Sequence, residues 1–187
     1  MGVSITSRQA VFLDRDGILN KSIVKQGKPY PPENLKEVVI PDEVKQGIRL
    51  LKNEGLLLIM ITNQPDIARN KTTEKNVNSI NNFVNHILNL DDIFMCIHDD
   101  NDNCNCRKPK PGMIIDAQKK WNIELNGSFL VGDRWKDISA GKKMNLITFF
   151  LDLGYKEKKV DADFEYKTFT QIVNQIIKLK NEKYIKS

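Results

Sequence analysis

The segment Ala10-Val-Phe-Leu-Asp14-Arg-Asp16-Gly17 places four apolar residues directly before two carboxylates and a glycine. A short apolar run that ends at polar and turn-forming residues predicts a buried β-strand. Gly17 suits a turn after that strand, because glycine adopts backbone conformations that are strained for other residues. The segment therefore predicts that Asp14 and Asp16 follow directly after a buried strand.

The rest of the 187-residue chain alternates between short β-like runs and patterns with helical spacing. The predicted strands comprise residues 10–13, 56–61, 93–97, 129–131 and 146–151. Three of the predicted helices comprise residues 42–55, with Asp42 as N-cap, residues 111–121 and residues 137–143. Two more are predicted from apolar residues at helical spacing: a segment capped by Thr72 or Thr73 with Val77, Ile80, Val84, Ile87 and Leu88, and a C-terminal segment with Phe169, Ile172, Val173, Ile176 and Ile177. This alternation predicts an α/β fold with a Rossmann-like, doubly wound parallel sheet between two layers of helices. Length and composition predict one domain, residues 1–187.

Polar residues follow four of the predicted strands. Thr62 comes after the second strand, the stretch from His98 to Lys108 after the third, and Asp133 and Asp137 after the fourth. Ligand sites of open parallel sheets lie beyond the carboxyl ends of the strands. We therefore expect these segments to meet Asp14 and Asp16 at one edge of the sheet.

Four carboxylates at that edge, those of Asp14, Asp16, Asp133 and Asp137, would repel one another and raise one another's pKa values without a cation. Mg²⁺ prefers oxygen ligands and shares its coordination between a few carboxylates, water and substrate phosphate. The sequence therefore predicts a Mg²⁺ site. The alternative for the first pair alone is an ordinary turn after a strand.

All three cysteines of the chain fall within residues 96–106, together with one of its two histidines. Cys96, His98, Cys104 and Cys106 form a ligand set that suits tetrahedral Zn²⁺, and four protein ligands leave no open position, so the predicted zinc site is structural. A disulfide is disfavoured in a cytoplasmic protein, and unligated cysteines remain an alternative. A Ca²⁺ loop is rejected because Cys104 occupies the position of its glycine.

The motifs Leu13-Asp14-Arg-Asp16-Gly17, Ile61-Thr62-Asn63-Gln64, Arg107-Lys108-Pro109 and Val131-Gly132-Asp133-x-x-x-Asp137 occur in this order. Together they resemble the four motifs of the haloacid dehalogenase superfamily of phosphotransferases. The resemblance covers about two thirds of the chain and implies a phosphatase of that fold.

The resemblance also implies a role for each motif residue. Asp14 is the expected nucleophile, which forms an aspartyl phosphate, and Asp16 the expected general acid and base. Mg²⁺ is expected on Asp14, on Asp16 through its main-chain carbonyl and on Asp133, with Asp137 in support. The residues expected to bind phosphate or substrate are Thr62, Asn63, Arg107 and Lys108.

The cysteine loop, followed by Arg107-Lys108-Pro109-x-Pro111-Gly112-Met113, resembles the branch of this superfamily without a large cap domain that contains the heptose bisphosphate and histidinol-phosphate phosphatases. The segment from Asn63 to Arg69 is more similar to the heptose enzymes, which implies removal of the 7-phosphate in nucleotide-activated heptose synthesis. In that branch the loop 21–36 is expected to shape the pocket. The family commonly has Ser-Gly where this chain has Pro65-Asp66, and Gly where it has Asn70.

Three alternatives stay open. The substrate could be histidinol phosphate or another small phosphorylated sugar, or the chain could be a polynucleotide 3′-phosphatase with the same aspartate pair. A non-catalytic zinc module that binds nucleic acid is favoured by the net charge of +5, but the loop carries Asp99, Asp100 and Asp102 and no aromatic residue. Residues 156–187 hold eight Lys against five acidic residues, which suits a solvated helix face.

We expect a cytoplasmic, monomeric protein without nucleic-acid or membrane partners. The first ten residues show no basic region before an apolar run, which a secretion signal requires. No apolar run approaches the ~18 residues that span a bilayer.

Overall fold

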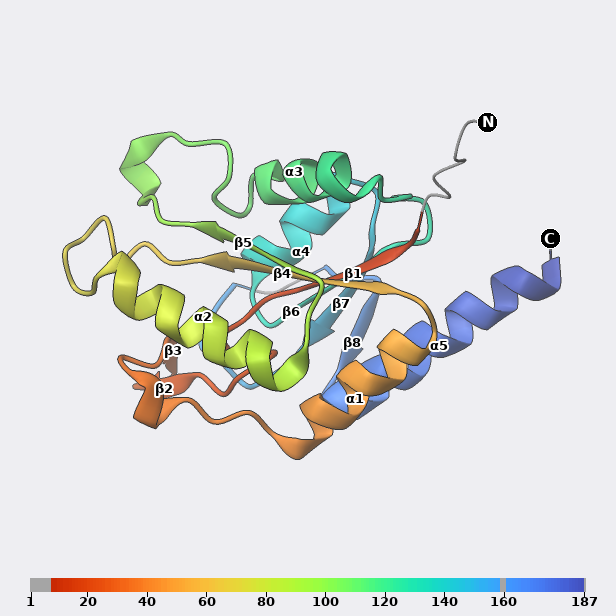
Figure 1. Ribbon diagram of the computed structural model, residues 1–187, viewed down its shortest axis with the longest axis horizontal. Coiled ribbons are helices and arrows are strands. Elements are labelled where there is room, and N and C mark those ends of the chain that lie inside the picture. Colours follow the sequence, from red (N-terminus) through yellow and green to blue (C-terminus); the bar gives the residue numbers. More distant parts are fainter. Residues whose placement is uncertain (1–7, 159–160, 187) are drawn as a thin grey trace.

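A computed structural model describes residues 8–158 and 161–186 and shows a central sheet with helices on both sides (Figure 1). The expectation about a secretion signal concerns the first ten residues, and residues 1–7 of these lie outside the part of the chain that the structure describes. Among the helices that are described, none is long and apolar enough to cross a membrane.

The central sheet has six strands in the order β5-β4-β1-β6-β7-β8, and every neighbouring pair is parallel. Its strands are β1 (Ala10–Leu13), β4 (Leu57–Asn63), β5 (Asp92–Cys96), β6 (Phe129–Gly132), β7 (Ile147–Leu151) and β8 (Phe164–Tyr166). The predicted doubly wound parallel sheet is confirmed. The edge strand β8 was not predicted, because its three residues, two partly buried and one exposed, give a weak apolar pattern.

Two helical layers enclose the sheet (Figure 1). One layer consists of α1 (Asp42–Asn53), α2 (Glu74–Leu88) and α5 (Phe169–Lys186), and the other of α3 (Gly112–Trp121) and α4 (Trp135–Lys142). Side chains alternate along β1, so Val11 and Leu13 join the core of the first layer, whereas Ala10 and Phe12 join that of the second. The three-layer α/β/α architecture is thereby confirmed.

The segment between β1 and α1 contains no separate cap domain. It forms an antiparallel hairpin of β2 (Ile23–Lys25) and β3 (Lys28–Tyr30), followed by the short 3₁₀ helix η1 (Leu35–Glu37). The hairpin lies within the predicted pocket loop 21–36 and was not predicted as regular structure.

Several predicted boundaries differ by one or two residues. Pro41 is the N-cap of α1, and Asp42 is the first helical residue, whose carboxylate accepts a hydrogen bond from Lys45 (2.9 Å). Thr73 caps α2 as predicted, since its hydroxyl accepts from the main-chain N–H of Asn76 (3.2 Å). Helix α4 begins two residues earlier than predicted, because the carboxylate of Asp137 caps its first turn.

Candidate active site

The central strand β1 brings the predicted site residues together. Leu13 pairs with Met60 of β4 on one side and with Val131 of β6 on the other. The residues that follow these three positions therefore lie side by side at the carboxyl edge of the sheet. A pocket opens there, lined by Asp14, Asp16 and Lys108 and by residues of the hairpin, including Tyr30.

Three of the four predicted carboxylates form a cluster. One oxygen from each of Asp14, Asp133 and Asp137 lies within 4.8 Å of the others, and all three side chains are buried. Both oxygens of Asp133 are buried without a hydrogen-bond partner among the described residues. Unpaired buried carboxylate oxygens are unfavourable unless a cation binds them, so this cluster fits a hard cation such as Mg²⁺.

Two glycines make room for this cluster. A Cβ atom on Gly17, whose φ is +98°, would lie 1.8 Å from Oδ2 of Asp133. A Cβ atom on Gly132 would lie 2.2 Å from the Cβ of Asp137. No side chain fits at either position without moving a carboxylate of the cluster.

The electrostatic environment reflects this crowding. Burial raises the pKa of Asp14 to about 6, against the opposing effect of Lys108 and with a further increase from Asp137. Burial raises the pKa of Asp133 well above its ordinary value, and the charges of Asp14 and Asp137 add to the increase. Without a cation, the cluster therefore disfavours full ionisation.

Lys108 supplies the positive charge that is present within the cluster. Its ammonium group contacts Oδ1 of Asp14 at 2.8 Å and Oδ1 of Asp137 at 2.6 Å, and it donates to the main-chain oxygen of Ile61 at 2.8 Å. The side chain is almost fully buried, yet the two carboxylates raise the pKa of the lysine above its ordinary value. Lys108 is therefore held as a fixed cation beside Asp14.

The end of β4 contributes Thr62, Asn63 and the adjacent Gln64. The side chain of Gln64 donates to Oγ1 of Thr62 (2.8 Å), which leaves the Thr62 hydroxyl proton for another acceptor. Asn63 exchanges two 3.0 Å hydrogen bonds with the main chain of Lys108. Asn63 therefore fixes the lysine loop, and its predicted contact with substrate stays a prediction.

The side chain of Asp16 departs from the expected cluster of four carboxylates. The chain turns at Arg15, whose carbonyl accepts from the N–H of Leu19 (2.9 Å), so the extended geometry that would aim Asp14 and Asp16 in one direction is absent. The Asp16 carboxylate instead pairs with the Arg15 guanidinium at 2.8 Å and still lines the pocket. This arrangement leaves only the main-chain carbonyl of Asp16 for the predicted metal contact.

Arg107 also differs from expectation. Its Nε donates to Oδ1 of Asp100 (2.7 Å), and the side chain does not line the pocket around Asp14. Its Nη1 is buried and has no hydrogen-bond partner in the described part of the chain. Asp100 of the cysteine loop holds this arginine through an ion pair, and the predicted role of Arg107 in phosphate binding stays a prediction.

The departures from the family pattern have a structural explanation. Asp66 lines the pocket and pairs with Arg69 (3.3 Å), which also binds Asp99. The guanidinium of Arg69 therefore balances the negative charge that Asp66 adds to the pocket. Asn70 has a φ of +56°, in the left-handed region that favours glycine. Arg69, Lys71 and Lys136 line the pocket but were not predicted as site residues, because lone surface cations give no sequence signal.

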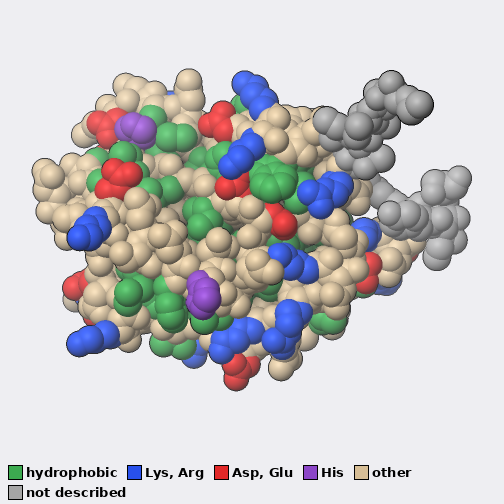
Figure 2. Space-filling view, in the orientation of Figure 1, with side chains coloured by type: hydrophobic (Ala, Val, Ile, Leu, Met, Phe, Trp, Pro, Cys, Tyr) green, Lys and Arg blue, Asp and Glu red, His purple; other side chains and the backbone are tan. Residues whose placement is uncertain are grey.

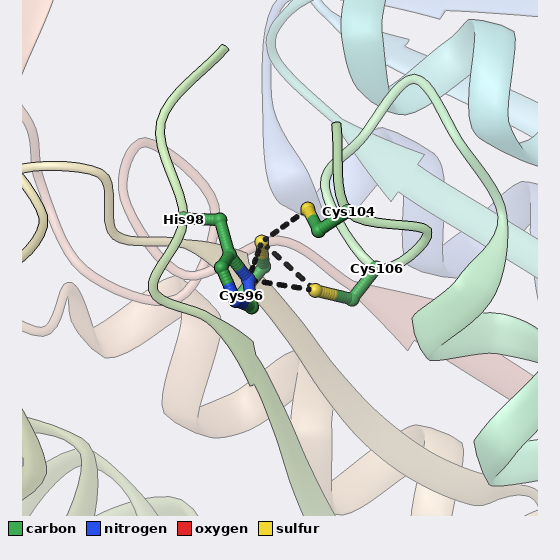
Figure 3. A group of neighbouring side chains, drawn as sticks. All are labelled: Cys96, His98, Cys104 and Cys106. Atoms are coloured by element: carbon green, nitrogen blue, oxygen red, sulfur yellow. Dashed lines mark hydrogen bonds between the residues drawn. The ribbon is translucent and has the colours of Figure 1, made fainter. Parts of the chain in front are cut away.

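Cys96, His98, Cys104 and Cys106 point toward one another (Figure 3). The Sγ atom of Cys96 lies 3.1 Å from Sγ of Cys106 and 3.7 Å from Sγ of Cys104, and Nδ1 of His98 lies 3.6 Å from Cys96 and 3.3 Å from Cys106. Ligands at ~2.0 to 2.3 Å from a tetrahedral Zn²⁺ lie about 3.3 to 3.8 Å apart. The donor set fits zinc, and three of these four distances fall within that range, whereas the 3.1 Å between the sulfurs of Cys96 and Cys106 is shorter.

Comparisons with known proteins agree with this geometry. The family model described as polynucleotide kinase 3 phosphatase matches residues 10–174. The chain belongs to this phosphatase family. Its curated relatives include the D-glycero-beta-D-manno-heptose-1,7-bisphosphate 7-phosphatase of Yersinia pestis, with 35% identity over 74% of this chain and 77% of that protein.

A second relative differs in the anomer that its name specifies. The D-glycero-alpha-D-manno-heptose-1,7-bisphosphate 7-phosphatase of Photorhabdus laumondii is 34% identical over 76% of this chain and 81% of that protein. The family and the names of these relatives identify the chain as a phosphatase, an enzyme that hydrolyses phosphoric monoesters.

Solved structures confirm the fold. The D,D-heptose 1,7-bisphosphate phosphatase of B. bronchiseptica, complexed with magnesium and phosphate, superimposes with a TM-score of 0.79 at 24% identity and covers 91% of this chain and 98% of its own. A HAD-superfamily hydrolase from Ehrlichia chaffeensis reaches a TM-score of 0.63 at 15% identity, over 93% of this chain and 99% of its own. The fold is therefore that of the haloacid dehalogenase superfamily.

Proposed function

We propose that this family member removes the 7-phosphate of D-glycero-D-manno-heptose 1,7-bisphosphate in a Mg²⁺-dependent reaction. The observation that carries the chemistry is the buried cluster of Asp14, Asp133 and Asp137 around the fixed charge of Lys108. The names of the curated relatives support the substrate.

Asp14 is the proposed nucleophile. The main-chain N–H of Arg15 (2.8 Å) and the ammonium of Lys108 both contact Oδ1 of Asp14, which leaves Oδ2 to attack phosphorus. Attack forms an aspartyl phosphate and breaks the bond between phosphorus and the sugar oxygen. The hydroxyl of Thr62 is the proposed donor to the phosphoryl oxygens, and the ammonium of Lys108 is the proposed positive charge beside them.

Asp16 is the proposed general acid and base. It gives a proton to the departing sugar oxygen, then takes a proton from the water that hydrolyses the aspartyl phosphate. When bound, Mg²⁺ would neutralise charge on the phosphate. Its proposed ligands are the carboxylates of Asp14 and Asp133 and the main-chain carbonyl of Asp16, with support from Asp137. Phosphate release then restores the Asp14 carboxylate.

The test is phosphate release from a panel of compounds at equal concentration, with and without added Mg²⁺. The panel contains both anomers of the heptose bisphosphate, histidinol phosphate and an oligonucleotide with a 3′-phosphate, the last because of the family description. We expect the highest kcat/KM for a heptose bisphosphate and no turnover by Asp14→Asn. Preference for histidinol phosphate or the oligonucleotide would refute the proposed substrate, and full activity of Asp14→Asn would refute the chemistry.

We also propose that the cysteine loop, residues 96–106, holds a structural Zn²⁺. Without a cation, burial raises the pKa of Cys96 well above that of an ordinary thiol, and a bound Zn²⁺ would reverse this by stabilising the thiolate. The loop lies between β5 and Lys108, so its metal would fix the approach of the lysine. Metal analysis tests the idea: one zinc per chain should survive mild chelation that removes Mg²⁺.

The remaining proposals concern the surroundings of the enzyme. We propose a cytoplasmic monomer that acts on a small phosphorylated sugar for nucleotide-activated heptose and lipopolysaccharide synthesis, without nucleic-acid or membrane partners. Lys and Arg side chains are interspersed with Asp and Glu on the face seen in Figure 2, which differs from the concentrated basic patch that nucleic acid requires. Size-exclusion chromatography and salt-dependent DNA binding test these two statements.

A further inference from the structure

Asn81 is a polar residue in the buried face of α2. It is 3% exposed and lies among the apolar residues Val77, Ile80 and Val84. A buried amide is unfavourable unless both of its ends have partners. Its Oδ1 accepts a hydrogen bond from Nη1 of Arg15 (2.8 Å), and its Nδ2 lies 3.5 Å from the sulfur of Met95.

Arg15 connects Asn81 to the active site. Its side chain is fully buried, and it binds Asp16 in a fork, with Nε to Oδ1 at 3.1 Å and Nη2 to Oδ2 at 2.8 Å. The guanidinium is planar and rigid, so its three bonded nitrogens move as one body. A hydrogen bond that fixes Nη1 at Asn81 therefore helps to fix the plane of the Asp16 carboxylate, which also accepts from Asn20 (3.1 Å) and Gln64 (2.9 Å).

We propose that Asn81, acting through Arg15, is a positioning residue for the general acid and base Asp16. The inference rests on the proposed function. In the first step the bond between phosphorus and the sugar oxygen breaks, and that oxygen takes the proton of Asp16. The rate of this transfer depends on the placement of the acid within hydrogen-bond reach of the oxygen, and Asn81 secures this placement from outside the pocket.

The leaving group distinguishes positioning from general damage. A sugar alkoxide needs a proton to depart, whereas p-nitrophenolate departs without one. The experiment compares the single-turnover rate of cleavage of heptose 1,7-bisphosphate with that of p-nitrophenyl phosphate. Both rates are measured for the unaltered enzyme and for Asn81→Leu, because leucine keeps the size of the side chain but removes the hydrogen-bond acceptor. The sugar rate should fall roughly tenfold or more while the p-nitrophenol rate changes less than about twofold.

Two further variants complete the test. Asn81→Asp retains an acceptor for Arg15 and should restore most of the sugar rate. Val84→Ala removes packing from the next turn of α2 and should lower stability without changing the ratio of the two rates. If Asn81→Leu does not fold, Asn81→Ser replaces it, because its hydroxyl is too short to reach Nη1.

An equal loss on both substrates, or no loss on either, would overturn the positioning role while leaving the proposed function intact. Absence of phosphate release by the unaltered enzyme from both compounds would overturn the proposed function and this inference together.

Discussion

Asp14→Asn should stabilise the metal-free protein while it abolishes activity. Burial raises the pKa of Asp14 from 3.8 to about 6, so the folded protein disfavours the ionised form by about 2 pKa units. At 1.36 kcal/mol per unit, ionised Asp14 destabilises the fold by about 3 kcal/mol above pH ~6. Asparagine resembles the neutral carboxyl in size, so the substitution removes this penalty.

The sign of the pH dependence follows from the raised pKa. Between pH 3.8 and about 6 the folded protein binds the proton of Asp14 more readily than the unfolded chain does, so the stability of the unaltered protein falls as the pH rises through this range. The gain from Asp14→Asn should therefore be complete at pH 8 and about half as large at pH 5. At pH 8 the gain corresponds to a Tm increase of roughly 6 to 12 °C for a chain of this size.

The assay is thermal and urea unfolding after dialysis into magnesium-free buffer without a chelator, so that the proposed zinc is not removed. Added Mg²⁺ should stabilise the unaltered protein by mass action and narrow the difference from Asp14→Asn. Asp116→Asn is the matched control, because Asp116 is exposed on α3. A variant that is less stable than the unaltered protein at pH 8, or a gain that does not change between pH 5 and pH 8, would refute the reasoning.

Three further outcomes are expected. Cys104→Ser should lose the proposed zinc and unfold at least ~10 °C lower, since structural zinc contributes directly to folding. Metal analysis with thermal unfolding checks this, and zinc retained at an unchanged Tm would contradict it. Lys108→Met leaves Asp14 and Asp137 without their shared cation, so kcat should fall roughly 10² to 10³-fold, as steady-state kinetics would show. Gly132→Ala places a Cβ atom 2.2 Å from that of Asp137, and urea unfolding should show a loss of roughly 1 to 3 kcal/mol together with reduced activity.

The sequence predicted those features that depend on local pattern and chain order. Alternating strands and helices led to the three-layer fold. The rule that parallel strands end at one edge correctly predicted that Asp14, Thr62, Lys108 and Asp133 lie at the same edge of the sheet. The four zinc-type ligands were predicted from spacing alone, and their side chains converge in the structure.

The features that were not predicted depend on long-range contacts. The helical pattern of α2 predicted Ile87 on the apolar face, yet Ile87 is 43% exposed. Asn81 lies inward instead, because the buried guanidinium of Arg15 needs a hydrogen-bond acceptor. The orientation of Asp16 also depends on Gln64, whose side chain donates to it across 48 positions of sequence (2.9 Å). That of Arg107 depends on Asp100 of the cysteine loop. A single sequence does not encode such pairings in any local pattern.

The register of the sheet places the cysteine loop next to the strand that borders the pocket. Cys96 of β5 lies directly opposite Asn63 of β4, and the carbonyl of Cys96 accepts from the N–H of Gln64 (2.7 Å). Neighbouring strands are about 4.8 Å apart, so the cysteine loop is one strand away from the residues that border the pocket. If cobalt replaced the proposed zinc at the cysteines, a change in its visible absorption on substrate binding would show that the loop and the pocket are coupled.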